Sequence, residues 1–268
     1  IDSLPSALTD DERQMAIDVI KRNADIFSKH DFDLGRTNLM THRIDVGNSE
    51  PVAQPLRSHP RAYLDLIDQT VDRMLQVGIL EPSESPWQSN IVLVSKKDGS
   101  LPRATVDFRW LNERTKKMKF ALPKTSDCLR ALGDSLYWSI CDVTNSFFQV
   151  SLHEDDRDVT AFVTRKGQFR FTTMPQGGVN SPAAFDKLMS LLTRGLSYLY
   201  CVCYVDDLVV VGRSFDEHVS HLETIFDRVR QARIKLKPTK CKLFQLKIRF
   251  VGHLISAQGI EPDPRKVA

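Results

Sequence analysis

Hydrophobic residues recur along this chain of 268 residues with two periods, which together predict a mixture of helices and strands. Helical spacing runs through residues 10–30, 61–80, 181–196 and 217–233. In the first of these helices, the face expected to be buried comprises Ile17, Ile20, Ala24 and Phe27. In the third, Ser181 is expected as the N-cap and Pro182 as the first helical residue.

Short apolar runs between turn signals predict the strands. They cover residues 91–95, 104–108, 135–142, 147–152, 159–164, 168–173, 200–205, 208–211, 242–245 and 248–255. The pair Asp98-Gly99 between the first two is a strong hairpin signal. From about residue 136 the order is strand–helix–strand–strand–helix–strand, which is typical of a ferredoxin-like α+β fold.

Composition is ordinary for a soluble globular protein, with 41% hydrophobic and 26% charged residues. No apolar run approaches the roughly 18–20 residues that cross a bilayer, and the first residues lack the pattern of a secretory signal. We therefore expect no association with a membrane. The five cysteines, an odd number without a second cluster at zinc-binding spacing, are expected to be buried, reduced thiols in an intracellular compartment.

Net charge is only +3, so any affinity for nucleic acid must come from how the charge is distributed. Between Lys96 and Lys124, nine lysines and arginines stand against three acids. Such a local excess suits a phosphate backbone, and an ordinary solvated face is an equally good interpretation of this segment alone.

Two neighbouring acids, Asp206 and Asp207, interrupt an otherwise apolar hairpin. Like charges repel at such a tip unless a divalent cation converts them into ligands. A third acid, Asp142, ends another hydrophobic strand, which a ferredoxin-like sheet can place beside this hairpin. Three such carboxylates can hold two magnesium ions that activate a 3′-hydroxyl and stabilise a leaving pyrophosphate.

Six motifs, in order and spacing, resemble those of reverse transcriptases from gypsy-type LTR retrotransposons and their retroviral relatives. They are residues 83–89 with 95–99, residues 106–112, Asp142, residues 174–185, residues 204–207 (YVDD) and residues 250–253 (FVGH). Each motif is weak alone, and the six together are highly specific.

The resemblance implies the fingers and palm of a right-hand polymerase. The fold is α+β, and its ferredoxin-like palm has an antiparallel sheet with helices on one face. Residues 43–117 and 150–180 would form the fingers, and residues 118–149 and 181–260 the palm. Residues 1–42 would be an N-terminal extension or polyprotein linker, and residues 261–268 the start of a truncated thumb.

The resemblance also implies roles for individual residues. Asp142, Asp206 and Asp207 are the catalytic acids, and together with Val143 they make up the metal site for two Mg²⁺ ions, with Mn²⁺ as a substitute. Residues implied to contact the incoming nucleotide are Lys96 (or its neighbour Lys97), Arg103, Asn145, Ser146, Phe147 and Gln176. Phe147 would lie beneath the sugar and exclude a 2′-hydroxyl. Residues implied to contact the primer are Tyr204, Phe250, Val251, Gly252 and His253.

Each of these roles has a plainer alternative. Lys96 and Arg103 could belong to an exposed basic hairpin, Phe147 to the core, Gln176 to a loop, and residues 250–253 to an ordinary β-hairpin. The chain also departs from the gypsy-type pattern: residues 145–147 are Asn-Ser-Phe instead of Ser-Gly-Tyr, Gln176 replaces a phenylalanine, and Pro102 stands where a tryptophan is common. None of these departures removes a metal ligand.

We therefore expect a reverse transcriptase that extends a primer on RNA or DNA with deoxynucleoside triphosphates, within a retrotransposon Pol polyprotein. Thumb, connection and RNase H regions are expected to lie outside this sequence. A dimer is possible, and the expected location is the cytoplasm, within virus-like particles, or the nucleus. One alternative is a host-adopted, non-catalytic module that binds nucleic acid or protein, which retention of all three aspartates disfavours. Another is an RNA-synthesising polymerase, which Phe147 disfavours.

Overall fold

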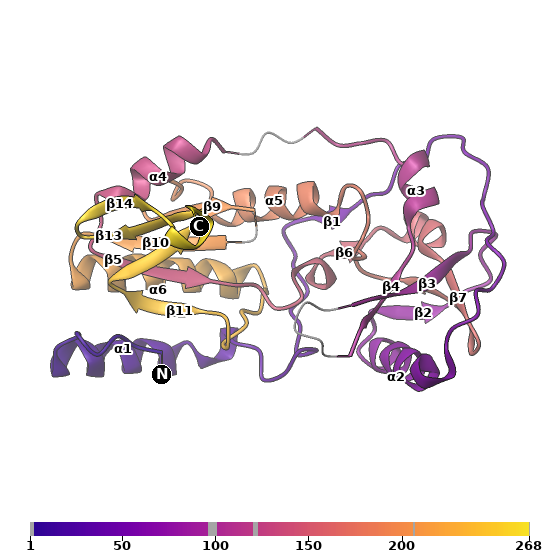
Figure 1. Cartoon of the computed structure of the whole chain (residues 1–268), viewed down its shortest axis with the longest axis horizontal. Helices are drawn as coiled ribbons and strands as arrows, with labels where there is room; N and C mark the ends of the chain where they lie inside the picture. Colours follow the sequence, from indigo (N-terminus) through magenta and orange to yellow (C-terminus); the bar gives the residue numbers. More distant parts are fainter. Residues whose placement is uncertain (1–2, 96–100, 120–122, 206, 268) are drawn as a thin grey trace. The chain divides into compact units, whose positions relative to one another are not determined.

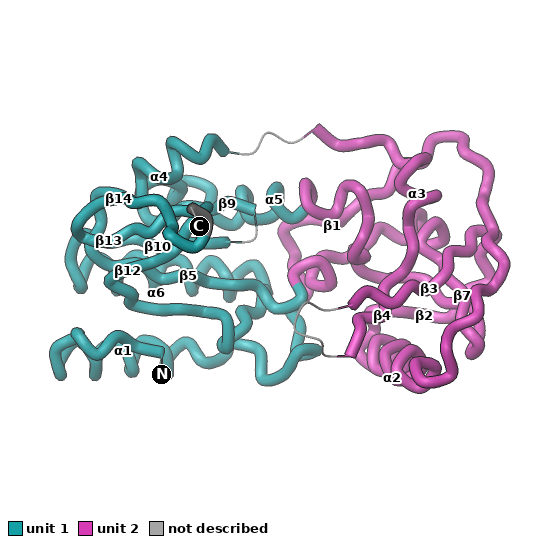
Figure 2. The backbone as a smooth tube through the Cα atoms, viewed as in Figure 1, with its two compact units in different colours: residues 1–35, 120–145, 185–268 teal, residues 36–119, 146–184 magenta. Residues whose placement is uncertain are grey.

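The computed structural model describes residues 3–95, 101–119, 123–205 and 207–267. The chain divides into two compact units, each built from separate stretches of sequence (Figure 2). The first unit comprises residues 1–35, 120–145 and 185–268, and the second comprises residues 36–119 and 146–184. Within the described residues, every helix is too short or too polar to cross a lipid bilayer.

The first unit is an α+β unit around a four-stranded antiparallel sheet (Figure 1). Its helices and strands are α1 (Asp10–Arg22), η1 (Ala24–Ile26), α4 (Thr125–Gly133), β5 (Tyr137–Cys141), most of α5 (Ser181–Leu192), β9 (Cys201–Tyr204), β10 (Asp207–Gly212), α6 (Phe215–Gln231), β11 (Lys242–Gln245), β12 (Lys247–Phe250), β13 (His253–Ser256), β14 (Gly259–Pro262) and α7 (Pro264–Val267). The sheet order β11-β5-β10-β9, with β5 and β10 in the centre, confirms the predicted ferredoxin-like order.

Both faces of this sheet are covered. Helix α6 packs on β10 and β5 on one face, and α1 packs on α6. On the other face, α4 and the β12–β13 hairpin enclose an apolar core. Its buried residues are Cys128, Leu132, Trp138, Val202, Val209, Val211, Ile248, Phe250 and Ile255. Each large apolar side chain buried in this way contributes about 1.5–3 kcal/mol, so the core holds the central strands firmly.

The second unit contains a five-stranded mixed sheet of order β2-β8-β7-β3-β4. Its helices and strands are β1 (Thr41–His42), α2 (Arg61–Gln76), β2 (Leu80–Pro82), β3 (Ser89–Val94), β4 (Arg103–Val106), α3 (Arg109–Arg114), η2 (Ser146–Gln149), β6 (Ser151–Leu152), η3 (Glu154–Asp156), η4 (Asp158–Thr160), β7 (Phe162–Thr164) and β8 (Gly167–Phe171). The predicted hairpins are confirmed, because β3 pairs with β4 and β7 pairs with β8, both antiparallel.

Three local predictions were wrong. Residues 147–152 form the 3₁₀ turn η2 and the two-residue β6 in place of one strand. Residues 248–255 are two strands, β12 and β13, because Val251 and Gly252 adopt positive φ angles (44° and 76°) and turn the chain back. The N-terminal helix buries Ala16 and Val19, not the predicted face, and ends at Arg22. Packing against α6 decides which face of α1 is buried, and the hydrophobic pattern within α1 does not contain that information.

The predicted start of α5 also differs slightly. The helix begins at Ser181 itself, and the Ser181 hydroxyl donates a hydrogen bond to the Pro175 carbonyl oxygen (2.8 Å). The predicted thiols are confirmed as free. Four are buried and Cys203 is partly exposed, and burial raises the pKa of Cys201 to about 12.

A buried polar network ties α6 to the central sheet. The His218 Nε2 atom lies 2.8 Å from the Ser139 Oγ atom in β5, which also accepts a hydrogen bond from the Phe244 N–H (2.9 Å). Phe244 lies in a bulge of β11 with a φ angle of 56°, so its N–H is free to reach Ser139. Gly212, at the end of β10, lies directly against the His218 backbone.

We predict that Gly212→Ala destabilises the protein by about 1–3 kcal/mol, because the new Cβ would lie 2.5–2.7 Å from His218 Cβ, Cα and N. Urea denaturation measures the effect. Gly133→Ala is the matched control, since its Cβ would meet only the flexible Ile260 side chain at 3.3 Å. Equal midpoints for the two variants would contradict the close packing of Gly212.

A second prediction concerns acid stability. Burial, together with the nearby charge of His221, lowers the pKa of His218 from 6.5 to about 3. Between these values the unfolded chain binds a proton that the folded chain excludes, so the free energy of unfolding falls as the pH decreases from about 7.

By this linkage, His218 accounts for about 2 kcal/mol of lost stability between pH 7 and pH 5. In His218→Gln that part of the loss should disappear. His42, whose pKa burial lowers to about 4, adds a loss of the same sign in both proteins. Urea titrations of both proteins across this pH range measure the difference. Parallel curves would show that His218 is not buried in its neutral form.

Candidate functional site

The register of the central sheet brings two of the predicted acids together. Strands β5 and β10 are antiparallel, and the last pair of their ladder joins Cys141 to Leu208. Continued by one residue, this register sets Asp142, which directly follows β5, opposite Asp207, the first residue of β10. Asp142 and Asp207, which are 65 residues apart in the sequence, thus come to the same end of two adjacent central strands; β5 and β10 are labelled in Figure 1.

The hairpin between β9 and β10 is as tight as predicted. Tyr204 pairs directly with Asp207, which leaves only Val205 and Asp206 between the strands. Val205 has a φ angle of 55°, which is costly for a β-branched residue and marks a strained tip. Asp206 lies outside the described residues.

Asp142 is paired with a lysine that the sequence analysis did not identify. The Lys240 Nζ atom lies 3.1 Å from Asp142 Oδ2. The Asp142 side chain is 22% exposed and the Lys240 side chain 60%, so the pair lies at the rim of the site. The carboxylate therefore already binds a cationic group supplied by the protein.

The turn that carries Lys240 is fastened to the backbone of Asp142. The Lys237 N–H donates to the Asp142 carbonyl oxygen (2.8 Å), and the Cys241 thiol reaches the same oxygen at 3.9 Å. The turn is closed by the Lys240 N–H, which donates to the Lys237 carbonyl oxygen (3.0 Å). Pro238 favours this turn because its ring presets the φ angle of the second position.

The residues after Asp142 are held by hydrogen bonds to the N-terminal segment. The Thr144 and Ser28 hydroxyl oxygens are 2.8 Å apart and buried, and the Asn145 amide donates to the Asp31 carbonyl oxygen (2.6 Å). Lys237 forms an ion pair with the Asp31 carboxylate (2.9 Å). Residues 26–31, which the sequence analysis assigned to an extension or linker, thus support the loop that follows Asp142.

This donor set suits a divalent cation. Asp142 and Asp207 supply the oxygen donors that hard cations prefer, and the Lys240 ammonium already contacts one of these carboxylates. Among the described residues no set of three His, Cys, Asp or Glu side chains is grouped for a metal, and Asp206 is not among them. Val143 is buried and forms a bridge with Leu236, and the only donor it could offer a metal is its backbone carbonyl oxygen.

The predicted primer residues form the β12–β13 hairpin. Phe250 pairs with His253, and the Phe250 ring meets Tyr204 edge to face at 6.0 Å. Because Phe250 is only 2% exposed, its ring belongs to the core. Val251, Gly252 and His253 are partly exposed at the turn, where a ligand could reach them.

The residues predicted to contact the nucleotide belong mainly to the second unit. Arg103 begins β4, is exposed and forms no ion pair with any residue that the structure describes. Lys96 and Lys97 lie outside the described residues. Asn145, in the first unit, has a φ angle of 40°, and its amide is committed to the Asp31 carbonyl oxygen.

Two adjacent phenylalanines in η2 take different environments. Phe148 is buried and stacks on Phe171 with ring centroids 6.2 Å apart. Phe147, like its neighbour Ser146, is only partly buried. Of the two rings, Phe148 therefore fills the core, and Phe147 keeps an accessible surface. This arrangement is compatible with the predicted contact to a sugar.

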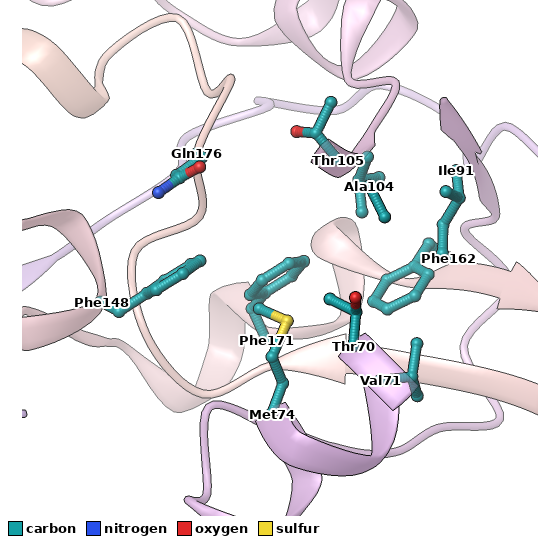
Figure 3. A pocket seen from close by; sticks show the side chains of 11 residues that line it. Thr70, Val71, Met74, Ile91, Ala104, Thr105, Phe148, Phe162, Phe171 and Gln176 are labelled. Carbon is teal, nitrogen blue, oxygen red and sulfur yellow. The ribbon is translucent and has the colours of Figure 1, made fainter. Parts of the chain in front are cut away.

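Gln176 lines a small apolar cavity of about 40 Å³ inside the second unit (Figure 3). Figure 3 shows Phe148 and Phe171 on the wall beside it and Ala104 and Thr105 from β4 on another wall. Gln176 is partly exposed and precedes Gly177, whose φ angle is 89°. Its amide thus stands where a mostly apolar cavity meets a turn.

Part of the basic segment is neutralised within the protein. Arg109 forms an ion pair with Asp107 (2.6 Å), and its guanidinium lowers the pKa of that carboxyl group. Lys116 forms an ion pair with Asp45 (2.8 Å). Exposed basic residues without an ion pair to a described residue are Arg103, Lys117, Lys119 and Lys124. These four remain available to an anionic ligand.

Comparison with protein families gives one match that covers most of the chain. Residues 94–255 match the model described as "Reverse transcriptase (RNA-dependent DNA polymerase)". Among curated relatives, the chain is 32% identical over 247 residues to the retrovirus-related Pol polyprotein from transposon 412 of Drosophila melanogaster. It is 28% identical over 257 residues to the corresponding polyprotein from transposon gypsy of the same species.

These alignments cover 90% and 93% of the chain, and only 20% and 25% of the two polyproteins. The chain therefore spans about a quarter or less of the length of these relatives. Among solved structures, it is similar to the foamy viral protease–reverse transcriptase in complex with an RNA/DNA hybrid, with a TM-score of 0.87 and 23% identity. That match covers 97% of this chain and 35% of the viral chain, and it shows the fold.

Proposed function

Because the chain belongs to the reverse transcriptase (RNA-dependent DNA polymerase) family, we propose that it is the polymerase part of a retrotransposon Pol polyprotein. In this proposal it adds deoxynucleotides to the 3′-hydroxyl of a primer on an RNA or DNA template. The observation that carries the proposal is the register of β5 and β10, which sets Asp142 opposite Asp207.

Members of this family generally use divalent metal ions. We propose that Asp142, Asp206 and Asp207 hold two Mg²⁺ ions, for which Mn²⁺ can substitute. When bound, the ions would supply the Lewis acidity that lowers the pKa of the primer hydroxyl and neutralises the leaving pyrophosphate. Hydrogen bonds from the Lys237 N–H and the Cys241 thiol to the Asp142 carbonyl oxygen hold the backbone of this residue in place.

Other side chains would position the nucleotide and the nucleic acid. An exposed arginine such as Arg103 presents a planar fork that suits phosphate oxygens, and Lys96 would add a mobile positive charge. The partly exposed Phe147 would exclude a 2′-hydroxyl, with Ser146 and Gln176 beside the nucleotide. The turn at Val251–His253 would hold the primer end. The second unit would then act as fingers and the first as palm.

Template and primer are the proposed macromolecular partners. The solved foamy viral structures were determined with an RNA/DNA hybrid and with double-stranded DNA. A thumb, connection and RNase H elsewhere in the polyprotein would complete the clamp, and a dimer could add to it. We propose a location in virus-like particles in the cytoplasm.

The first functional prediction is that Asp142→Asn reduces primer extension by about 100-fold or more, since an amide is a poor ligand for a hard cation. The fold should persist, because the Asp142 side chain is bonded at the surface, to Lys240. The assay is extension of a labelled primer with and without Mg²⁺. Asp227→Asn, which also breaks an exposed ion pair, is the control.

Near-normal extension by Asp142→Asn would refute the proposed mechanism. Retained primer–template binding without extension by the wild type would favour a non-catalytic, nucleic-acid-binding module.

Sugar selection gives a further prediction. Phe147→Ala should increase ribonucleotide incorporation relative to deoxynucleotides by on the order of tenfold, because it removes the surface proposed to meet the 2′-hydroxyl. Phe148→Leu is the matched control, since the neighbouring ring is buried against Phe171. It should lower stability and leave the incorporation ratio unchanged. An unchanged ratio in Phe147→Ala would show that the Phe147 ring does not contact the sugar.

A further inference from the structure

Lys240 contacts a carboxylate that is proposed to bind metal, but Lys240 itself has no role in the proposed reaction. Its ammonium lies 3.1 Å from Asp142 Oδ2, on the carboxylate proposed to bind metal. The other lysine of the same turn, Lys237, points instead to Asp31. Only one of the two charges on this turn is therefore aimed at the metal site.

The turn fixes the backbone of Lys240 but leaves its side chain free to move. Backbone hydrogen bonds from Lys237 to Asp142, and from Lys240 and Cys241 to Lys237, hold the main chain in place. The side chain is 60% exposed, so its flexible stem can move into solvent without disturbing the turn. The ion pair can thus open while Asp142 remains positioned.

Like charges explain why such a counter-ion is useful. The register sets Asp142 opposite Asp207, so without a cation two acids would face each other at the same end of the sheet. A lysine at this rim lowers the repulsion, yet an exposed ion pair is weak enough to be displaced. A divalent cation bound by the same carboxylate would repel the ammonium.

We propose that Lys240 is a built-in counter-ion that occupies the Asp142 carboxylate in the metal-free protein and competes with the divalent cation for it. This inference rests on the proposed metal site and adds that Lys240 regulates how strongly this site binds a metal ion. Loss of the lysine charge strengthens metal binding and lowers the stability of the metal-free protein. Loss of the Asp142 carboxylate instead weakens metal binding.

The experiment measures Mn²⁺ binding directly, by electron paramagnetic resonance of free Mn²⁺, without nucleic acid or nucleotide. We expect Lys240→Gln to lower the dissociation constant about two- to fivefold, the range that corresponds to an exposed ion pair. Lys240→Arg keeps the charge and should bind Mn²⁺ like the wild type. Lys242→Gln, an exposed lysine two residues away without a carboxylate partner among the described residues, should also leave binding unchanged.

Thermal denaturation gives a second readout. Without metal, Lys240→Gln should melt below the wild type, and Mn²⁺ should raise its melting temperature by more than it raises that of the wild type. In the Asp142→Asn background, Lys240→Gln should no longer change Mn²⁺ affinity, because the carboxylate for which the two cations compete is gone.

The outcomes separate this inference from the proposed function. If Asp142→Asn binds Mn²⁺ as well as the wild type does, the metal site itself is refuted. If Asp142→Asn loses binding while Lys240→Gln equals the wild type and Lys242→Gln, the metal site stands and the counter-ion role is refuted. Weaker binding in Lys240→Gln would also overturn the inference, because it would mean that Lys240 supports the bound metal.

Discussion

The antiparallel pairing of β5 with β10 is the constraint on which the rest of the site depends. A shift of one residue would exchange the two faces of the sheet, moving Trp138 and Val209 out of the α4 core and toward α6. Because α6 covers one face and α4 with the β12–β13 hairpin covers the other, such a slip is excluded on both sides. The same register that buries the core sets Asp142 opposite Asp207, so the packing of the sheet positions the chemistry.

Beyond the strand end, three distant segments keep Asp142 in place. The turn at residues 237–241 is bonded to its backbone, and residues 26–31 hold the loop that follows it. The negative charge of the Asp142 side chain is balanced by Lys240. This ion pair links the stability of the metal-free protein to its affinity for metal. This arrangement gives this member of the reverse transcriptase family a fixed backbone at Asp142, whose charge Lys240 compensates.

Predictions from the sequence were most accurate where a short local pattern is compatible with only one kind of structure. The Asp98-Gly99 signal between two apolar runs predicted the β3–β4 pairing, and the order of elements predicted the ferredoxin-like sheet. The predictions failed where distant partners override local preference. Residues 147–149 carry strand-like side chains and yet form a 3₁₀ turn, with Phe148 packed on Phe171.

The sequence by itself determined the family, the order of strands and the identity of the acids, because these depend on short motifs and on side-chain chemistry. Only the tertiary structure decided that Phe147 rather than Phe148 stays accessible, that residues 26–31 support the site, and that Lys240 pairs with Asp142. The partners in the supporting contacts lie far apart in the sequence, for example 98 residues in Asp142–Lys240 and 206 residues in Asp31–Lys237. Hydrophobic periodicity predicts the type of an element, but it carries no information about which distant side chain packs against it.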